Sequence, residues 1–256
     1  MPADFLHSYL LDRRGGRRVL DATGLGEWTP DAGLLWVHLD VDEESSRDWL
    51  VSESGLPAAV VESLLAVETR PRSHVSEQGS LIVLRGVNMN PGDDPEDMVS
   101  VRIWLEPDRI VSTRRRRLLS VQDVRAALDE GHGPATSGAF LVALIARIAD
   151  RIGDFVNLLE EQISEAEDRA ETGDIASSRK SNTILRRQLA SVRRFLAPQR
   201  DALDRLYRQP GKLFSDAESN GLREEADRMT RYLEDIDLAR ERLVVMQEEF
   251  LAQQAQ

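Results

Sequence analysis

The stretch LREEADRMTRYLEDIDLARERLVVMQEEF, residues 222–250, carries an apolar side chain at every seventh position. These side chains are Leu222, Met229, Ile236, Leu243 and Phe250. Tyr232, Ala239 and Met246 fall between them, so the seam alternates three- and four-residue spacings. This pattern predicts one amphipathic stalk helix from about residue 215 to the chain end. At about 1.5 Å per residue it would be roughly 60 Å long, so we expect part of it to pack outside its own domain.

Carboxylates occupy another position of the same repeat, and we call them the acidic stripe. They are Asp227, Glu234, Glu241 and Glu248. One interpretation is the solvated face of an amphipathic helix, which is the commoner case for an acidic helix. The other places several copies around an axis, where each position becomes a carboxylate ring that concentrates cations. Like charges held close together cost stability unless water or cations screen them, and no Lys interrupts the stripe.

Two further long helices are expected before the stalk, over about residues 137–172 and 175–208, with Gly173-Asp174 as the stop and new N-cap between them. Acids dominate the end of the first helix, and bases dominate the second. We therefore expect an antiparallel hairpin whose register is favoured by opposite charge, with the stalk seam packed on it. Pro198 should kink the second helix or loosen one turn.

The first half of the chain reads as mixed α/β, with short apolar or alternating runs between turn residues. The expected strands are 18–22, 34–40, 74–78, 81–88, 98–106 and 109–113, and the expected helices are 43–54, 57–66 and 121–130. Strand 98–106 alternates in a way that predicts one core face. The last helix opens with Ser120 and Asp123 at capping-box spacing.

The fold class is therefore α+β: an α/β/α sandwich with a largely antiparallel mixed sheet, then a long helical hairpin and a long stalk helix. The expected divisions are 1–132 for the α/β domain, 133–213 for the hairpin and 214–256 for the stalk.

Composition narrows the function. The 256 residues carry a formal net charge of -12 and no Cys, which argues against nucleic-acid binding and excludes thiolate metal sites. No signal peptide or apolar membrane span is expected. Only four His occur, and no zinc-protease, nucleophile-elbow or phosphate-loop motif accompanies them, so we expect no enzyme. His38 is interpreted as a satisfied sheet histidine. The run 114–117 (RRRR) is a solvated strand end or a partner for acids of a neighbouring subunit.

Several segments together resemble the CorA-type metal-ion transporters, particularly their zinc-transporting, ZntB-like branch. They are WVHLD at 36–40, ETRPR at 68–72, LRGVN at 84–88, STRRRRLLSVQD at 112–123 and RRFLAPQRDAL at 193–203. The order of elements also matches that family.

The resemblance implies a homopentameric funnel on the cytoplasmic side of the bacterial inner membrane. In that family the stalk continues into the first of two membrane helices, which is followed by a Gly-Met-Asn motif that is absent here. We therefore expect this fragment to stop about where the membrane begins. The implied ions are Zn²⁺, with Mg²⁺ and Co²⁺ as further candidates, transported or regulatory; no cofactor is expected.

The resemblance also assigns individual residues. Glu224 matches a stalk acid that binds regulatory cations in magnesium-transporting relatives, and its partner from a neighbouring subunit falls near Asp93 or Asp94. Glu248 matches a pore-side stalk acid and belongs to the acidic stripe. The candidate metal-contacting residues are thus Glu224, Asp227, Glu234, Glu241, Glu248, Asp93 and Asp94. Zinc prefers nitrogen or sulfur ligands, which are scarce here.

Two other classes stay open at this point. One is a cytosolic coiled-coil scaffold or signalling module without a membrane partner, and a weaker one is a carboxylate-based hydrolase. The native sequence after Gln256 would distinguish transport from scaffolding.

Overall fold

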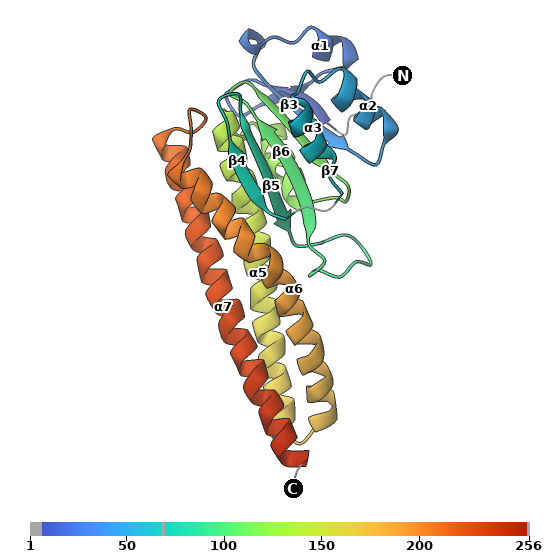
Figure 1. Cartoon of the computed structure of the whole chain (residues 1–256), viewed down its shortest axis with the longest axis vertical. Coiled ribbons are helices and arrows are strands. Elements are labelled where there is room, and N and C mark those ends of the chain that lie inside the picture. The colour runs from blue at the N-terminus through green and yellow to red at the C-terminus, as the bar shows by residue number, and fades with distance from the viewer. Residues whose placement is uncertain (1–6, 68–69, 255–256) are drawn as a thin grey trace.

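The computed structural model describes residues 7–67 and 70–254, and it joins a mixed β-sheet to a bundle of three long helices (Figure 1). Within those residues, no helix is both long enough and apolar enough to cross a membrane.

The sheet has seven strands in the order β2-β1-β3-β7-β6-β5-β4. They are β1 His7–Leu11, β2 Arg17–Val19, β3 Leu34–Asp40, β4 Arg72–Val75, β5 Ser80–Gly86, β6 Val99–Leu105 and β7 Arg109–Arg114. Among these described strands, β3 and β7 pair in parallel, and every other neighbouring pair is antiparallel. The predicted largely antiparallel mixed sheet is confirmed, although β1 was not among the expected strands.

Short helices and the start of the bundle cover the two faces of the sheet. The helices before the bundle are α1 Ala22–Gly26, a 3-10 turn Pro30–Ala32, α2 Glu44–Ser52, α3 Ala58–Leu65 and α4 Leu119–Asp129. Helices α2 and α3 pack on the face that carries Val37 and Trp104, whereas α4 and the long helix that follows it pack on the face that carries Trp36 and Ile103. The expected sandwich is therefore present.

Two local expectations in this region are wrong. Strand β6 is buried on both faces rather than one, because α3 covers the side that carries Arg102 and Trp104. Ser120 and Asp123 form no capping box: the N-cap of α4 is Leu118, without a side-chain cap bond. Asp123 instead pairs with Arg151 at 2.9 Å.

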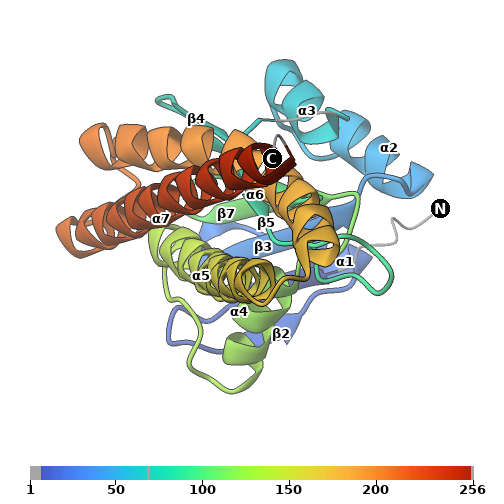
Figure 2. The ribbon, with the colours of Figure 1, turned by 90° about the horizontal axis from the view of Figure 1, so that it is seen from below.

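The bundle consists of α5 Ser137–Glu171, α6 Ile175–Arg208 and α7 Asp216–Gln254. The predicted helix stop is confirmed: Gly173 takes a φ of +90°, and the Asp174 carboxylate accepts from the Ser177 N–H at 3.2 Å. Helix α6 continues through Pro198 and changes direction along its length (Figures 1 and 2).

Within one chain the stalk helix packs on the hairpin, as its apolar seam predicted, and packing against anything beyond this chain stays a prediction. Because α5 and α6 have 35 and 34 residues, they accompany the 39-residue α7 along its length. A single apolar core runs from one face of the sheet to Phe250 near the end of α7. The division into domains at 132 and 213 stays a prediction.

The expected pairing of opposite charges between the two hairpin helices is not observed. Among the described residues, no ion pair joins α5 to α6. Acids of α5 pair with arginines of α7, and Arg193 of α6 pairs with Asp237 of α7. The third helix therefore connects the two charged helices.

Candidate functional site

Helix α7 presents two different faces. Its seam residues are buried against α5 and α6, from Leu222 and Met229 at 0% exposure to Phe250 at 4%, as the spacing predicted. The acidic stripe lies on the opposite side. Asp227, Glu234, Glu241 and Glu248 are all exposed, and Glu224 near the start of the helix is exposed as well.

The stripe has no internal counterions. Across residues 7–67 and 70–254, none of the stripe carboxylates forms an ion pair within the chain. Between them, at the intervening heptad position, lie Arg231, Leu238 and Val245, and the last two are 61% and 54% exposed. This solvent-facing strip therefore combines carboxylates with uncovered apolar side chains.

The loop between β5 and β6 holds the other two candidate acids. The Asp93 carboxylate accepts from Asn88 Nδ2 at 3.0 Å and lies 3.4 Å from Arg116. Asp94 is exposed, and its backbone carbonyl accepts from Asp97 N at 3.0 Å. Both views of the ribbon place this loop on the opposite side of the molecule from the start of α7, so one chain does not bring either acid to Glu224 (Figures 1 and 2).

The described residues contain no group of three or more His, Asp or Glu side chains arranged to hold a metal ion. A cation at the stripe or at Glu224 would therefore meet fewer than three such side chains from the described part of a given chain. Further protein ligands would have to come from other copies, and water would complete the shell, as is common for hard divalent cations.

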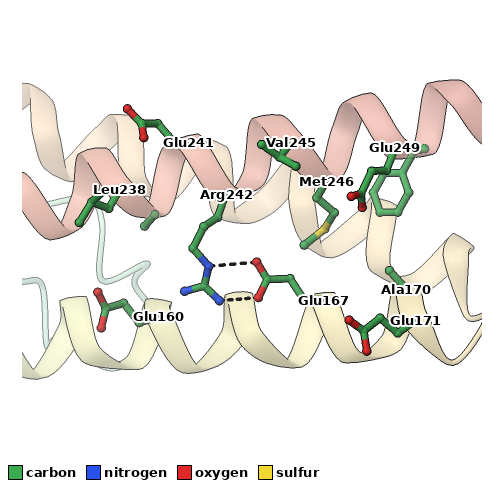
Figure 3. Close-up of a pocket in the computed structure, with 12 residues that line it drawn as sticks. Glu160, Glu167, Ala170, Glu171, Leu238, Glu241, Arg242, Val245, Met246 and Glu249 are labelled. Atoms are coloured by element: carbon green, nitrogen blue, oxygen red, sulfur yellow. Dashed lines mark hydrogen bonds and ion pairs between the residues drawn. The ribbon is translucent and has the colours of Figure 1, made fainter.

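Arginines of α7 fix the helix to the bundle, and the sequence analysis did not single them out. Arg228 donates to Asp150 at 2.7 Å, to Glu225 at 3.1 Å and to the Tyr232 hydroxyl at 3.1 Å. Glu225 is only 8% exposed, and this burial raises the pKa of its carboxyl. Arg242 makes a two-pronged contact with Glu167 of α5 (Figure 3).

Three arginines of the run after β7 pair with acids of their own chain. Arg116 and Arg117 at its end are exposed, as expected for a solvated strand end, and pairing with a neighbouring subunit stays a prediction. Arg114 lies 3.6 Å from Asp40, Arg115 pairs with Asp42, and Arg116 pairs with Asp97 at 2.8 Å.

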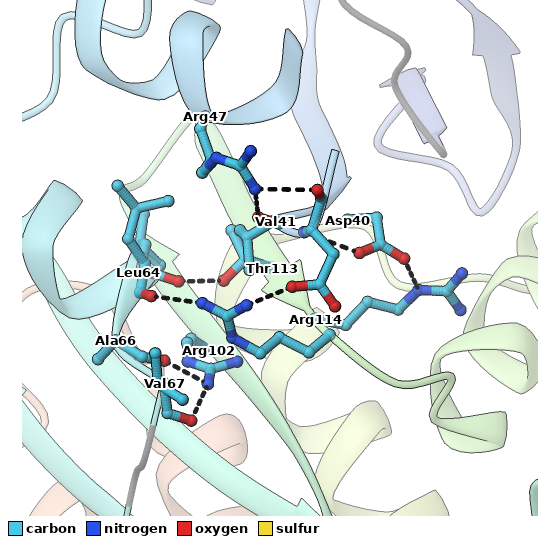
Figure 4. Close-up of polar contacts among 12 residues, drawn as sticks. Asp40, Val41, Arg47, Leu64, Ala66, Val67, Arg102, Thr113 and Arg114 are labelled. Atoms are coloured by element: carbon cyan, nitrogen blue, oxygen red, sulfur yellow. Dashed lines mark hydrogen bonds and ion pairs between the residues drawn. The ribbon is translucent and has the colours of Figure 1, made fainter. Parts of the chain in front are cut away.

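Arginines also hold the end of α3. Arg102 is fully buried and donates to the carbonyls of Ala66 at 2.6 Å and Val67 at 3.3 Å, while Arg115 donates to Leu65 at 3.1 Å (Figure 4). Burial lowers the pKa of Arg102 to about 10. These bonds satisfy carbonyls at and just beyond the C-terminal end of a helix. The role of Arg102 is therefore structural. The sequence did not predict this role, because the alternation in the strand places Arg102 on the face opposite the expected core.

His38 is the sheet histidine that the sequence suggested, although it is satisfied on one nitrogen only. It is 0% exposed, and its Nδ1 lies 2.8 Å from the Ser112 hydroxyl. Its Nε2 has no hydrogen-bond partner among the residues that the structure describes. Burial, followed by the nearby charges of His7 and Arg114, holds the pKa of His38 well below its ordinary value.

Comparison with known proteins shows which class of protein carries this fold and this acidic helix. The family model described as "CorA-like Mg2+ transporter protein" matches residues 31–256. The chain is 34% identical over 247 residues to the "Divalent cation transporter CmaX" of Pseudomonas aeruginosa, covering 95% of this chain and 74% of that protein. It is 32% identical over 247 residues to the "Zinc transport protein ZntB" of Pectobacterium carotovorum, covering 96% and 74%. These relatives are described as transporters rather than enzymes.

Solved structures agree. The full-length CmaX structure superposes with a TM-score of 0.88 at 30% identity, covering 100% of this chain and 80% of that one. The ZntB cytoplasmic domain of Vibrio parahaemolyticus gives 0.85 at 25% identity and covers 98% of both chains. The soluble domain of CorA from Methanocaldococcus jannaschii, at 15% identity and a TM-score of 0.79, shares the fold.

The sheet, the three-helix bundle and the acid-lined terminal helix thus define a domain of the metal-ion-transporter class. Within that class, the chain belongs to the CorA-like Mg²⁺ transporter family.

Proposed function

We propose that this chain is the cytosolic funnel domain of a pentameric divalent-cation transporter, with the acidic stripe of α7 facing the shared axis. The observation that carries the proposal is a stripe of four exposed carboxylates that form no ion pair with any residue of 7–67 and 70–254, on a helix whose opposite seam is buried. Around an axis, each heptad position becomes a carboxylate ring that attracts cations and repels anions.

One relative's name supports zinc as the first candidate ion, and the description of the family supports magnesium; cobalt remains a candidate from the resemblance alone. The ligands that the stripe offers limit how it could bind such an ion. Helix α7 contains no His or Cys, so the stripe offers oxygen ligands alone. Oxygen ligands suit hard, hydrated cations, whereas zinc prefers nitrogen and sulfur. In this proposal the rings gather hydrated ions rather than strip their water.

Regulation by cations would use Glu224 and an acid of the β5–β6 loop from the neighbouring copy. Asp94 is the better candidate, because its carboxylate forms no ion pair within residues 7–67 and 70–254. Asp93 already faces Arg116 at 3.4 Å, and a cation would have to compete with that charge.

The chain spans about three quarters of the curated relatives it matches. In this proposal, membrane-spanning segments follow residue 256, and the domain lies on the cytoplasmic side of the bacterial inner membrane. The family match argues against the scaffold alternative, which has no membrane partner.

Flux measurements test the proposal. The gene-length protein in liposomes should transport Zn²⁺, and the variant D227N/E234Q/E241Q/E248Q should lower the initial rate at least tenfold. The control E161Q/E165Q/D168N neutralises exposed acids of α5 and should keep the wild-type rate. Equal rates for the stripe and control variants would refute the axial placement, and absence of any divalent-cation flux would refute transport.

A binding experiment tests regulation. Calorimetry should detect weak Zn²⁺ or Mg²⁺ binding to the wild-type assembly and a loss of that heat in E224A/E248A. Unchanged binding in the variant would exclude these acids as cation ligands.

A further inference from the structure

A groove runs between α5 and α7 at the end of the bundle that is farthest from the sheet (Figure 3). It encloses about 760 Å³. Its charged lining consists of Glu160, Glu167, Glu171, Glu241, Glu249 and Arg242. Of the five carboxylates, Glu167 alone has an ion-pair partner within the described part of the chain. We call this feature the acidic groove.

The groove also has an apolar wall that the described part of the chain leaves exposed. Leu238 and Val245 line it and are 61% and 54% exposed, and the buried Met246 and Phe250 line it as well. Uncompensated carboxylates beside exposed apolar side chains suit an occupant that brings positive charge and apolar surface together.

The opposite flank of α7 carries that chemistry. Helix α6 borders α7 there, and Arg179 and Arg186 line the cleft between the two helices. Together with the exposed Lys180, Ile184 and Arg187 of the same turns, they make up what we call the basic α6 face. Ile184 is 43% exposed. Only Arg187 approaches a carboxylate within residues 7–67 and 70–254, at 3.8 Å from Glu96. The α5–α7 groove and the α6–α7 cleft have only Phe250 in common among their described lining residues.

The two surfaces also lie at the same height along the bundle. Glu167 contacts Arg242, and Asn182 Nδ2 donates to the carbonyl of the next residue, Leu243, at 2.8 Å. Glu167 and Asn182 are therefore level. Arg179 and Arg186 lie about one turn on either side of Asn182. A rotation about an axis parallel to the bundle preserves height, so it brings the basic α6 face of one copy to the acidic groove of the next.

We propose that the acidic groove of one chain receives the basic α6 face of a second copy of the same chain. The contact is heterologous, because two different patches meet, and repeating it closes a ring when the rotation allows. This inference rests on the proposed assembly around α7 and adds the residues that join neighbouring copies.

Charge reversal gives a direct test on the 256-residue chain. The first variant, R179E/R186E, makes both surfaces acidic. The second variant, E160R/E171R, makes the groove basic, so both surfaces are basic. None of the four residues forms an ion pair within the described chain, so circular dichroism and melting temperatures should match wild type.

Sedimentation velocity at low and high salt provides the readout. The wild-type chain should associate in a salt-sensitive way, each variant alone should associate at least tenfold more weakly, and an equimolar mixture of the two should regain association. The control E161R/D168R makes the same charge change on α5 outside the groove and should associate as wild type does.

A mixture that stays monomeric, or single variants that associate as tightly as wild type, would overturn the proposal. The proposal would also be overturned if both the wild-type chain and the mixture of the two variants stayed monomeric, because the groove would then not bind a second copy. If the mixed variants associate but the full-length protein shows no divalent-cation flux, transport is refuted and the interface is supported. If the protein transports cations but the mixed variants do not associate, this interface alone is refuted.

Discussion

Arg193 of α6 and Asp237 of α7 make a two-pronged contact, with Nε 2.7 Å and Nη2 3.2 Å from the two carboxylate oxygens. This pair fixes the register of two helices that are 44 residues apart at this point of the chain. Its hydrogen bonds lower the pKa of Asp237.

The Arg193–Asp237 pair should contribute modestly to stability, because both side chains are more than 40% exposed. R193A, D237A and the double variant in a urea double-mutant cycle should give a coupling of about 0.5–1 kcal/mol. The folded pKa of Asp237 is depressed, so its contribution is present above the unfolded value near 4 and is lost as pH falls through the folded pKa. A coupling that stays constant from pH 7 to pH 2 would contradict this assignment.

Loss of Arg228 should be more costly, since it leaves Glu225 buried without its cation. We expect R228M to destabilise the chain by about 2 kcal/mol at pH 7. Burial raises the pKa of Glu225 in the folded state, so the folded state holds this proton more tightly than the unfolded state does. The free energy of unfolding therefore falls as pH rises from the unfolded pKa of Glu225 through its folded pKa. The penalty should shrink near pH 4, and E225Q should relieve much of it at pH 7. The control is R231M, because Arg231 is exposed and forms no ion pair in the described chain.

Apolar truncations should separate the two faces of α7. Ile236 is 0% exposed, and I236A should cost about 3 kcal/mol in a urea titration. Leu238 is 61% exposed, and L238A should change the stability of the monomer by less than about 0.5 kcal/mol. Similar losses for both variants would mean that the seam has been assigned to the wrong face.

His38 should make the chain sensitive to mild acid. Its pKa is held well below the ordinary value, so below about pH 6 the unfolded state takes up a proton that the folded state does not. Stability should then fall by about 1.4 kcal/mol per pH unit for this group as pH decreases. H38Q should flatten that slope between pH 6 and 5, whereas H132Q, at an exposed position, should not.

The repeat in α7 was enough to predict a continuous helix, a buried seam and an exposed acidic stripe. Leu222 and Phe250 are buried and Glu234 and Glu248 are exposed, because the face of a helical residue follows from its spacing in the sequence. The N-cap at Asp174 was also predictable, because it depends only on neighbouring residues of the chain. The acids assigned by family resemblance, Glu224 and Asp94, stay predictions, since one chain keeps them apart.

Tertiary structure alone decided the partners of the charges. Neither the pairing of Arg228 with Asp150 nor the turning of Arg115 towards Asp42 and the end of α3 follows from spacing. Arg102 looked solvent-facing until α3 covered it. A charged side chain reaches several ångströms in many directions, so its partner depends on how distant elements cross. The sequence by itself determined which face each residue occupies; the crossing of α5, α6 and α7 determined what that face meets.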